Sequence, residues 1–122
     1  YFEVKVHAMA QEVVLAIGLT TRPYPLFRMP GWNKFSVAYH SDDGRKFCDD
    51  PTGGQEYGPS WGVGDIVGCG YQPETGNIFF TLNGRMIDQA FVGLERHHYF
   101  ASFGADGFAQ VSINFGQRPF LF

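Results

Sequence analysis

The sequence predicts an all-β fold in which two antiparallel sheets pack face to face as a β-sandwich. Short apolar segments rich in strand-forming residues alternate with turns that contain glycine, proline, asparagine or aspartate. No segment has a helical hydrophobic period longer than a turn or two. The 13 Phe and 16 Gly among 122 residues suit a large aromatic core with tight turns. A chain of this length fits one domain, and we expect residues 1–122 to form it.

The first part of the chain contains four predicted strands. Residues Tyr1–His7 alternate apolar and polar side chains, which is the period of a half-buried strand. Residues Val13–Leu19 are continuously apolar apart from Gly18, which indicates a strand that is buried on both faces. The third and fourth strands, Phe35–His40 and Arg45–Cys48, are joined by the turn sequence Ser-Asp-Asp-Gly.

The central stretch, residues 65–91, predicts three antiparallel strands in a meander. Asp65–Tyr71 and Asn77–Leu82 are joined by Gln-Pro-Glu-Thr-Gly, in which proline and glycine favour a turn. Asn83-Gly84 is a strong two-residue hairpin signal, and it starts a returning strand, Arg85–Phe91. These strands are too apolar to face water on both sides, so we expect another sheet to cover them.

The C-terminal part predicts one further hairpin. Residues Gly93–Tyr99 are expected to form a single helical turn. Tyr99–Gly104 and Phe108–Phe115 follow as strands, closed around Ala-Asp-Gly at positions 105–107. Polar and apolar residues alternate in the last strand, so one of its faces is expected to contact water. The chain then has about nine short strands, which two stacked sheets accommodate.

Two long segments between the strands are the candidate binding regions. Thr20–Lys34 contains three prolines and Asp49–Val63 contains four glycines, so neither is expected to form regular structure. Both are rich in aromatic residues and the first also in arginine, the residue types enriched at binding hot spots. In an alternative interpretation, Trp32 and Trp61 only plug the ends of the sandwich. The candidate partner-binding residues of the two segments are Arg22, Tyr24, Phe27, Arg28, Trp32, Tyr57 and Trp61.

No pattern in the chain indicates a catalytic site, a metal site or a cofactor. The pairs Asp42-Asp43 and Asp49-Asp50 are typical of solvated turns, and they lack the ordered spacing of a calcium loop. The adjacent His97 and His98 have no further zinc ligands nearby in the sequence. The glycine-rich segment before Ile66 precedes a strand rather than opening a helix, unlike a phosphate-binding loop. We therefore expect no enzymatic activity.

The composition limits which classes of partner and which cellular compartment we expect for the protein. A formal net charge of −3 with scattered basic residues gives no nucleic-acid footprint and no support for membrane-surface binding. Cys48 and Cys69 do not make a disulfide framework, and free thiols in a reducing compartment are expected. No apolar run approaches the ~18 residues that span a bilayer. The chain begins inside a strand-like segment, so we expect it to be a domain of a longer protein.

A succession of sequence motifs resembles one known family over nearly the whole chain. The motifs are YFEV at 1–4, AIGL at 16–19, PGWNKFSVAYHSDDGRKF at 30–47, YGPSWGVGDIVGCGY at 57–71, IFFTLNG at 78–84 and VSINFG at 111–116. Together they resemble a SPRY domain. Within that family, the motifs between positions 30 and 71 are similar to the Ran-binding-protein-M type. The GADG and NFGQ motifs are most similar to fungal transmembrane adaptors that recruit a HECT-type ubiquitin ligase to endosomal and vacuolar cargo.

The resemblance implies a bent β-sandwich without catalytic activity, whose loops at one end bind a short segment of a partner protein. As in the adaptors, the domain is expected to recognise membrane-protein cargo for ubiquitination. It is expected to face the cytosol in a protein anchored in an endosomal or vacuolar membrane. The ligase is recruited through regions outside this chain, and the domain itself contacts no membrane and no nucleic acid. In the last predicted hairpin, Asp106 and Phe108 are further candidate partner-binding residues.

Departures from the family narrow these expectations. The chain starts at YFEV, so we expect an N-terminal edge strand typical of the family to be missing, and we expect no PRY extension before it. His40, Asp42 and Asp43 occupy a segment that is basic in relatives that bind acidic peptides, which disfavours acidic or phosphorylated ligands there. Two alternatives stay open: a scaffold SPRY domain of a multi-subunit ubiquitin ligase, and a sugar-binding or glycosidase jelly roll.

Overall fold

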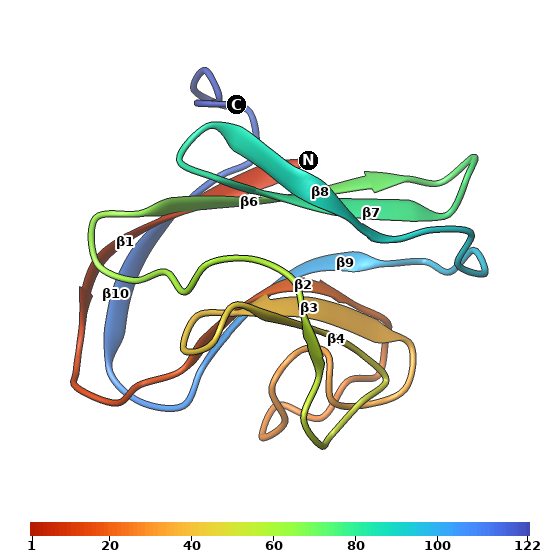
Figure 1. Ribbon diagram of the computed structural model, residues 1–122, viewed down its shortest axis with the longest axis horizontal. Helices are drawn as coiled ribbons and strands as arrows, with labels where there is room; N and C mark the ends of the chain where they lie inside the picture. Colours follow the sequence, from red (N-terminus) through yellow and green to blue (C-terminus); the bar gives the residue numbers. More distant parts are fainter.

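The computed structural model describes residues 1–122 and contains ten strands and no helix. As the sequence predicts, the strands form two antiparallel five-stranded sheets that lie one above the other (Figure 1). Sheet A has the strand order β10-β1-β6-β7-β8, and sheet B has the order β5-β4-β3-β2-β9. The strands are β1 (Phe2–Met9), β2 (Leu15–Thr20), β3 (Ser36–His40), β4 (Arg45–Cys48), β5 (Gln55–Glu56), β6 (Ile66–Gln72), β7 (Asn77–Leu82), β8 (Arg85–Phe91), β9 (Phe100–Ala105) and β10 (Ala109–Asn114).

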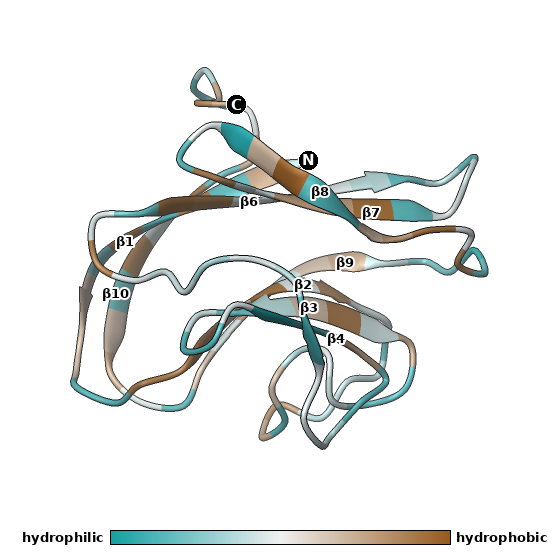
Figure 2. Cartoon of the chain, in the orientation of Figure 1, coloured by the Kyte–Doolittle hydropathy of each residue, from teal (hydrophilic) through white to brown (hydrophobic).

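The core lies between the two sheets, and the alternation of side chains along each strand builds it. Leu15, Ile17 and Leu19 of β2 belong to one cluster of 15 buried residues, together with Ile78 and Phe80 of β7. Brown, hydrophobic bands mark β3, β6 and β7 in Figure 2. Full burial of one such aliphatic or aromatic side chain contributes roughly 1.5–3 kcal/mol. The packing of one sheet on the other is therefore the main source of stability.

The central meander forms as predicted, with β6, β7 and β8 as neighbours in sheet A. Asn83 and Gly84 have φ angles of 53° and 85°, the geometry of a two-residue hairpin turn that Asn-Gly favours. Phe80 is fully buried in the core. Phe79 points to the opposite face, where its ring centroid lies 6.0 Å from that of Tyr1 and 5.8 Å from that of Phe122. Another sheet thus covers only the inner face, and aromatic residues from both ends of the chain cover part of the outer face.

The predicted last hairpin is wrong. Strand β9 pairs with β2 in sheet B, whereas β10 pairs with β1 in sheet A, so the two strands lie in different sheets. The chain changes sheets at residues 106–108, beside the place where it also changes sheets between β1 and β2. There the Asp106 N–H donates to the Val14 carbonyl at 3.2 Å, and the Val14 N–H donates to the Asp106 carboxylate at 2.7 Å. These bonds satisfy backbone groups that a hairpin would have paired between its strands.

Two other segments differ from the prediction. Residues 93–99 form no helical turn and run irregularly beside the β6–β7 turn, where the Leu94 N–H donates to the Gly76 carbonyl at 3.0 Å. The second long segment contains the short strand β5, which pairs with β4 at the edge of sheet B. The other nine strands begin and end within two residues of the predicted positions.

Both cysteines are unlinked, and they lie on different sheets, Cys48 on β4 and Cys69 on β6. Burial raises the pKa of the Cys69 thiol to about 12, so this thiol stays protonated at neutral pH. The structure contains no helix with the length and apolar character needed to cross a membrane.

Candidate partner-binding surface

The first long loop, residues 21–35, packs on the outer face of sheet B and lies below β3 and β4 in Figure 1. Small residues of the sheet allow this close approach. A Cβ atom added to Gly104 would lie only 2.6 Å from Cδ of Pro30. A separate small cluster joins the loop to the sheet, and its buried members are Ala16, Met29 and Ala38. The loop is therefore held on the sheet by its own apolar contacts.

Hydrogen bonds inside the loop fix its shape. The Tyr24 hydroxyl donates to the Met29 carbonyl at 2.6 Å and accepts the Asn33 N–H at 3.1 Å. The Arg28 N–H donates to the Pro25 carbonyl at 3.1 Å and closes a turn. Because these bonds satisfy backbone groups locally, the loop holds one conformation without strand pairing.

His40 of β3 connects the sheet to the loop. Its ring stacks on that of Phe47 with centroids 3.9 Å apart, and its Nε2 lies 2.9 Å from the Pro30 carbonyl. Since a carbonyl only accepts, Nε2 carries the proton and donates. Burial lowers the pKa of His40, so the imidazole is neutral at pH 7. The buried His40 ring thus links strand β3 to Pro30 of the loop.

At the tip of the loop, large apolar side chains project into water. Leu26 is 101% exposed and Phe27 is 86% exposed, although both belong to a loop that is otherwise packed and bonded. Next to them, the Arg28 guanidinium lies 5.6 Å from the centroid of the half-buried Trp32 ring. We call the side chains of Leu26, Phe27, Arg28 and Trp32 the tip surface.

In the second long loop, Trp61 lies in the core and Tyr57 packs against it. Trp61 is 5% exposed, and its ring centroid lies 5.9 Å from that of Tyr39. Tyr57 packs against the same core, and its hydroxyl donates to the Asp88 carbonyl at 2.5 Å. Burial raises the pKa of Tyr57 to about 12. The interpretation of Trp61 as a plug fits its burial, whereas Tyr57 is half-buried and also lines a surface pocket with Arg45 and Glu56.

The remaining candidates are divided between the two ends of sheet B. Arg22 follows β2, and its guanidinium lies 4.3 Å from the ring centroid of Phe100, the first residue of β9. Asp106 and Phe108 follow the other end of β9. The structure joins Tyr24, Arg28 and Trp32 in one loop. Trp32 packs against the same small cluster as Val14, whose backbone N–H donates to the Asp106 carboxylate.

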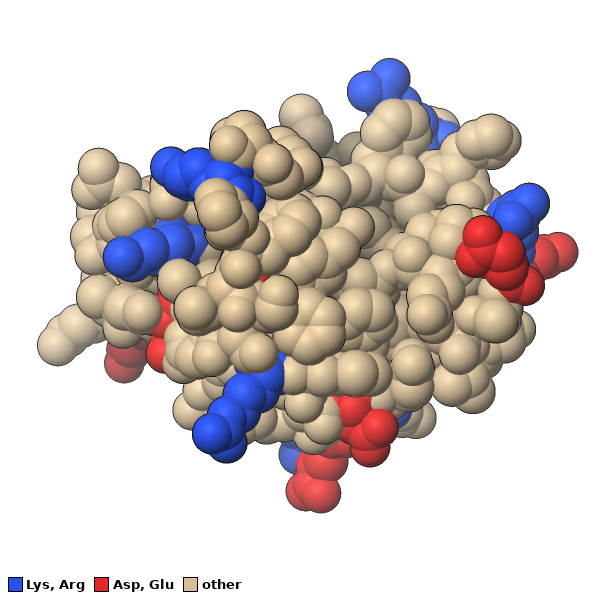
Figure 3. Space-filling view, turned by 90° about the horizontal axis from the view of Figure 1, so that it is seen from above, with Lys and Arg blue, Asp and Glu red and all other residues tan.

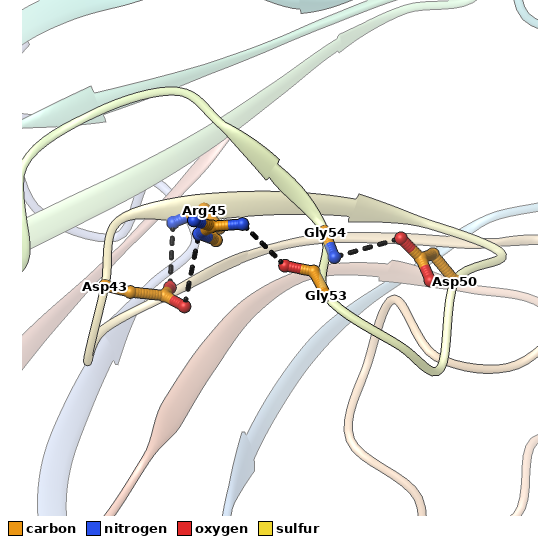
Figure 4. Close-up of polar contacts among 5 residues, drawn as sticks. All are labelled: Asp43, Arg45, Asp50, Gly53 and Gly54. Atoms are coloured by element: carbon orange, nitrogen blue, oxygen red, sulfur yellow. Dashed lines mark hydrogen bonds and ion pairs between the residues drawn. The ribbon is translucent and has the colours of Figure 1, made fainter.

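The acidic pairs take part in turns. Asp43 accepts the Arg45 N–H at 3.0 Å and pairs with the Arg45 guanidinium at 3.7 Å, as Figure 4 shows. Arg45 in turn donates to the Gly53 carbonyl at 3.2 Å. Asp50 accepts the Gly54 N–H at 3.0 Å and orders the start of the second loop. Each of these contacts has a structural explanation, and no group of His, Cys, Asp or Glu is arranged to hold a metal ion.

Charged side chains lie mainly around the rim of the outer side of sheet A (Figure 3). Figure 3, seen from that side, shows Lys, Arg, Asp and Glu around the rim and a broad area without charge between them. Both signs occur on this face, and basic groups lie close together at its upper left in Figure 3.

Several exposed residues have no clear signal in the sequence. Leu26 is recognisable only as one more apolar residue of a long loop. The sequence places Phe35 inside a strand, whereas its φ is 58° and its ring is 46% exposed, 4.5 Å from the ring of His97. Phe100 begins β9 as a strand-forming residue, and only the structure shows it under Arg22.

Comparison with known proteins agrees with this architecture. The SPRY domain family model matches residues 1–118. A crystal structure of a human SPRY domain superposes with a TM-score of 0.85 and 29% sequence identity, covering 97% of this chain and 77% of that one. The match extends over both sheets and nearly every loop described above.

Full-length relatives show the same family. The chain is 44% identical over 122 residues to protein ssh4 of Sclerotinia sclerotiorum and 43% identical to protein ssh4 of Neurospora crassa. It is 41% identical over 123 residues to Ran-binding protein 9 of Xenopus tropicalis. Each match covers the whole of this chain, which spans only 22–24% of the length of these relatives. By family model, sequence and fold, the chain belongs to the SPRY domain family.

Proposed function

We propose that this SPRY domain recognises membrane-protein cargo and thereby selects it for ubiquitination and endosomal or vacuolar sorting. SPRY domains are protein-interaction modules, so the general function of the family is protein binding. In the proposed role the domain faces the cytosol, and its longer protein is anchored in the endosomal or vacuolar membrane. Other regions of that protein recruit the ubiquitin ligase.

The tip surface is the observation that carries this proposal. Leu26 and Phe27 are almost fully exposed, whereas the loop that bears them is fixed by internal bonds and by packing on sheet B. A fixed loop loses little conformational entropy when it binds. Apolar side chains beside an arginine and a tryptophan are the composition of a protein-binding hot spot. We assign to this surface an apolar segment of the cargo.

Two relatives support two candidate functions, a cargo adaptor and a scaffold domain of a ubiquitin ligase. The identity of 44% to a fungal ssh4 protein supports the cargo-adaptor role, because the motifs of the sequence resemble those of fungal transmembrane adaptors. The identity of 41% to Ran-binding protein 9 supports the second candidate, a scaffold domain in a multi-subunit ubiquitin ligase. The family assignment gives no comparable support to a sugar-binding or glycosidase jelly roll.

The test uses the longer protein in cells, with Leu26→Ser and Phe27→Ser combined. The control combines Val63→Ser and Val92→Ser, which remove apolar side chains that are 60% and 65% exposed elsewhere. Quantitative mass spectrometry measures the abundance and ubiquitination of membrane proteins. We expect the tip variant to lose ubiquitination of a defined set of them, since a hot spot contributes at least ~2 kcal/mol of binding.

Normal ubiquitination of that set by the tip variant would remove the tip surface from the site. A different result would favour the scaffold function over the adaptor function. In that case the tip variant no longer binds soluble subunits of a ligase, and deletion of the whole domain leaves cargo ubiquitination unchanged. The control variant should match the wild type in both measurements.

A further inference from the structure

A second group of side chains gathers at the end of the sandwich where Arg22 lies, and none of them belongs to the tip surface. A cavity of about 330 Å³ is lined by Thr21, Arg22, Phe35, His97, His98 and Phe100. A neighbouring cavity of about 400 Å³ is lined by Tyr71, Pro73, Arg96, His97, His98 and Tyr99. Because His97 and His98 line both, we call the two cavities together the end pocket. Its volume is in the range of natural ligand sites.

Aromatic rings form the walls of the end pocket. The Arg22 guanidinium lies 4.3 Å from the centroid of the Phe100 ring, which is 41% exposed. The Phe35 ring is 46% exposed and lies 4.5 Å from that of His97. The contact with Phe100 holds the planar guanidinium in place, and the edge of the guanidinium still carries its N–H donors.

The backbone of Phe35 is held in an unfavourable conformation. Its φ of 58° lies in the left-handed region, which a bulky residue other than glycine rarely adopts. The Thr21 hydroxyl donates to the Phe35 carbonyl at 3.3 Å and helps to fix this geometry. Residues held in this way are concentrated at binding and catalytic sites. The strain turns the Phe35 ring toward His97 and the cavity rather than into strand β3.

Several hydrogen-bond donors and positive charges of the end pocket have no partner within the protein. The ion pairs of the chain are Arg45 with Asp43 and His97 with Glu95, so Arg22 and Arg96 have no carboxylate partner. The guanidinium groups of Arg22 and Arg96 also make no hydrogen bond to the protein, in contrast to that of Arg45. The buried hydroxyl of Tyr71 has no partner either. A ligand that matches these groups carries negative charge and several acceptor oxygens.

We propose that the end pocket binds an acidic side chain, a carboxylate or a phosphate, that lies beside an apolar residue in an extended segment of a partner protein. Arg22 pairs with the acidic group, and the rings of Phe35 and Phe100 contact the apolar neighbour. The segment from His40 to Asp43, where the sequence disfavours acidic ligands, begins at the opposite end of β3. The two observations therefore concern different sites.

Short fluorescent peptides test the charge requirement on the 122-residue chain. One set places Asp, Glu or phosphoserine beside Phe, and the matched set replaces the acidic residue by Asn, Gln or Ser. We expect the acidic peptides to bind at least about tenfold more tightly by fluorescence anisotropy. Their affinity should fall as salt is raised, because exposed charges are screened. Equal affinity of the acidic and neutral sets would overturn the proposal.

Three variants locate the site. Arg22→Gln should weaken the acidic peptides about tenfold, whereas Arg85→Gln, which removes an exposed arginine at the β7–β8 turn, should change nothing. Phe35→Gly keeps the backbone at a φ that glycine adopts freely, so the fold persists while the ring is lost and both peptide sets bind less tightly. Equal effects of Arg22→Gln and Arg85→Gln would place the site elsewhere. The combined Leu26→Ser and Phe27→Ser change should leave peptide binding intact. The proposals for the end pocket and for the tip surface are therefore tested independently.

Discussion

The two long loops have similar compositions, yet the tip of the first projects large apolar side chains into water and the tryptophan of the second is buried. In the first loop, Leu26 is 101% exposed and Phe27 is 86% exposed. In the second loop, Trp61 is only 5% exposed and the Tyr57 hydroxyl reaches the Asp88 carbonyl of sheet A. Both loops combine proline or glycine with aromatic residues, so composition alone does not separate a presenting loop from a core loop.

The position of each loop relative to the sheets explains the difference. The first loop connects β2 to β3, which are neighbours in sheet B, so it starts and ends on one sheet and lies on its outer face. The second loop leaves β4 of sheet B and contains β5 at the edge of that sheet. It then crosses the open side between the sheets to β6 of sheet A. Its large side chains meet apolar surface on both sides and fill that opening. A loop that joins two sheets thus completes the core, whereas a loop that returns to its own sheet is free to present side chains.

The largest expected effect is on the second loop. Trp61→Ala removes a nearly buried ring from the aromatic core, and we expect a loss of about 3–5 kcal/mol in the free energy of unfolding. That is a large share of the ~5–15 kcal/mol typical of a domain. Urea unfolding followed by fluorescence of the remaining tryptophan, Trp32, measures it. A loss below about 1 kcal/mol would mean that Trp61 does not anchor the loop in the core.

A smaller effect is expected from the hydroxyl of Tyr57. It donates to the Asp88 carbonyl at 2.5 Å and accepts the Phe80 N–H at 3.3 Å, so Tyr57→Phe leaves two backbone groups without this partner. We expect a loss of about 1–3 kcal/mol. Tyr71→Phe is the matched control, since its buried hydroxyl has no partner and its removal should not destabilise the fold. Equal unfolding free energies of the two variants would contradict the role of the Tyr57 bridge between the sheets.

The first loop should respond to pH through His40. Burial lowers the pKa of His40 below its ordinary value of 6.5, so the unfolded chain binds more protons than the folded chain in the window just below that value. This contribution to stability is complete above about pH 6.5 and is lost as the pH falls. His40→Gln keeps an amide donor for the Pro30 carbonyl but does not titrate, so its stability should vary less between pH 7 and 5. An unchanged pH dependence in the variant would show that titration of His40 does not account for it.

The smallest effect on folding is expected at the tip of the first loop. Leu26→Ser and Phe27→Ser should each change the free energy of unfolding by no more than about 0.5 kcal/mol, because both side chains are already in water. Val63→Ser, at a 60% exposed position of the second loop, serves as the control in the same thermal and urea melts. A substantial loss at position 26 or 27 alone would reveal contacts of the tip with the rest of the fold.

Much of the fold can be predicted from the sequence because its signals are local. Alternation of apolar residues, the Asn83-Gly84 turn and the continuous apolar run around Ile17 each define a strand without reference to the rest of the chain. The last hairpin could not be predicted correctly. Ala-Asp-Gly at positions 105–107 favours a reversal in any context, but pairing with β2 and β1 sends the two strands to different sheets.

Some residues of the candidate site could likewise be predicted from the sequence, and others could not. Arg28, Trp32 and Tyr24 were expected in a binding loop, and the structure places them together in the first loop. Nothing local distinguishes Trp61 from Trp32, since each follows a glycine- or proline-containing turn. Their burial depends on which sheets the flanking strands join. The exposed ring of Phe35 depends on a left-handed backbone that its residue type does not favour, so no propensity indicates it.

The position of β1 within sheet A determines when this sheet can be completed during synthesis. Val4 pairs with Val67 on one side and with Ile113 on the other, so a strand from the start of the chain lies between a central strand and the last one. During synthesis, β1 gains its first neighbour when β6 emerges, but its other edge stays open until residues 109–114 have left the ribosome. Such distant pairing forms slowly because a long stretch of chain must first be ordered. A nascent chain that stalls before residue 109 exposes an apolar strand edge, which is the kind of surface that chaperones bind and aggregates extend.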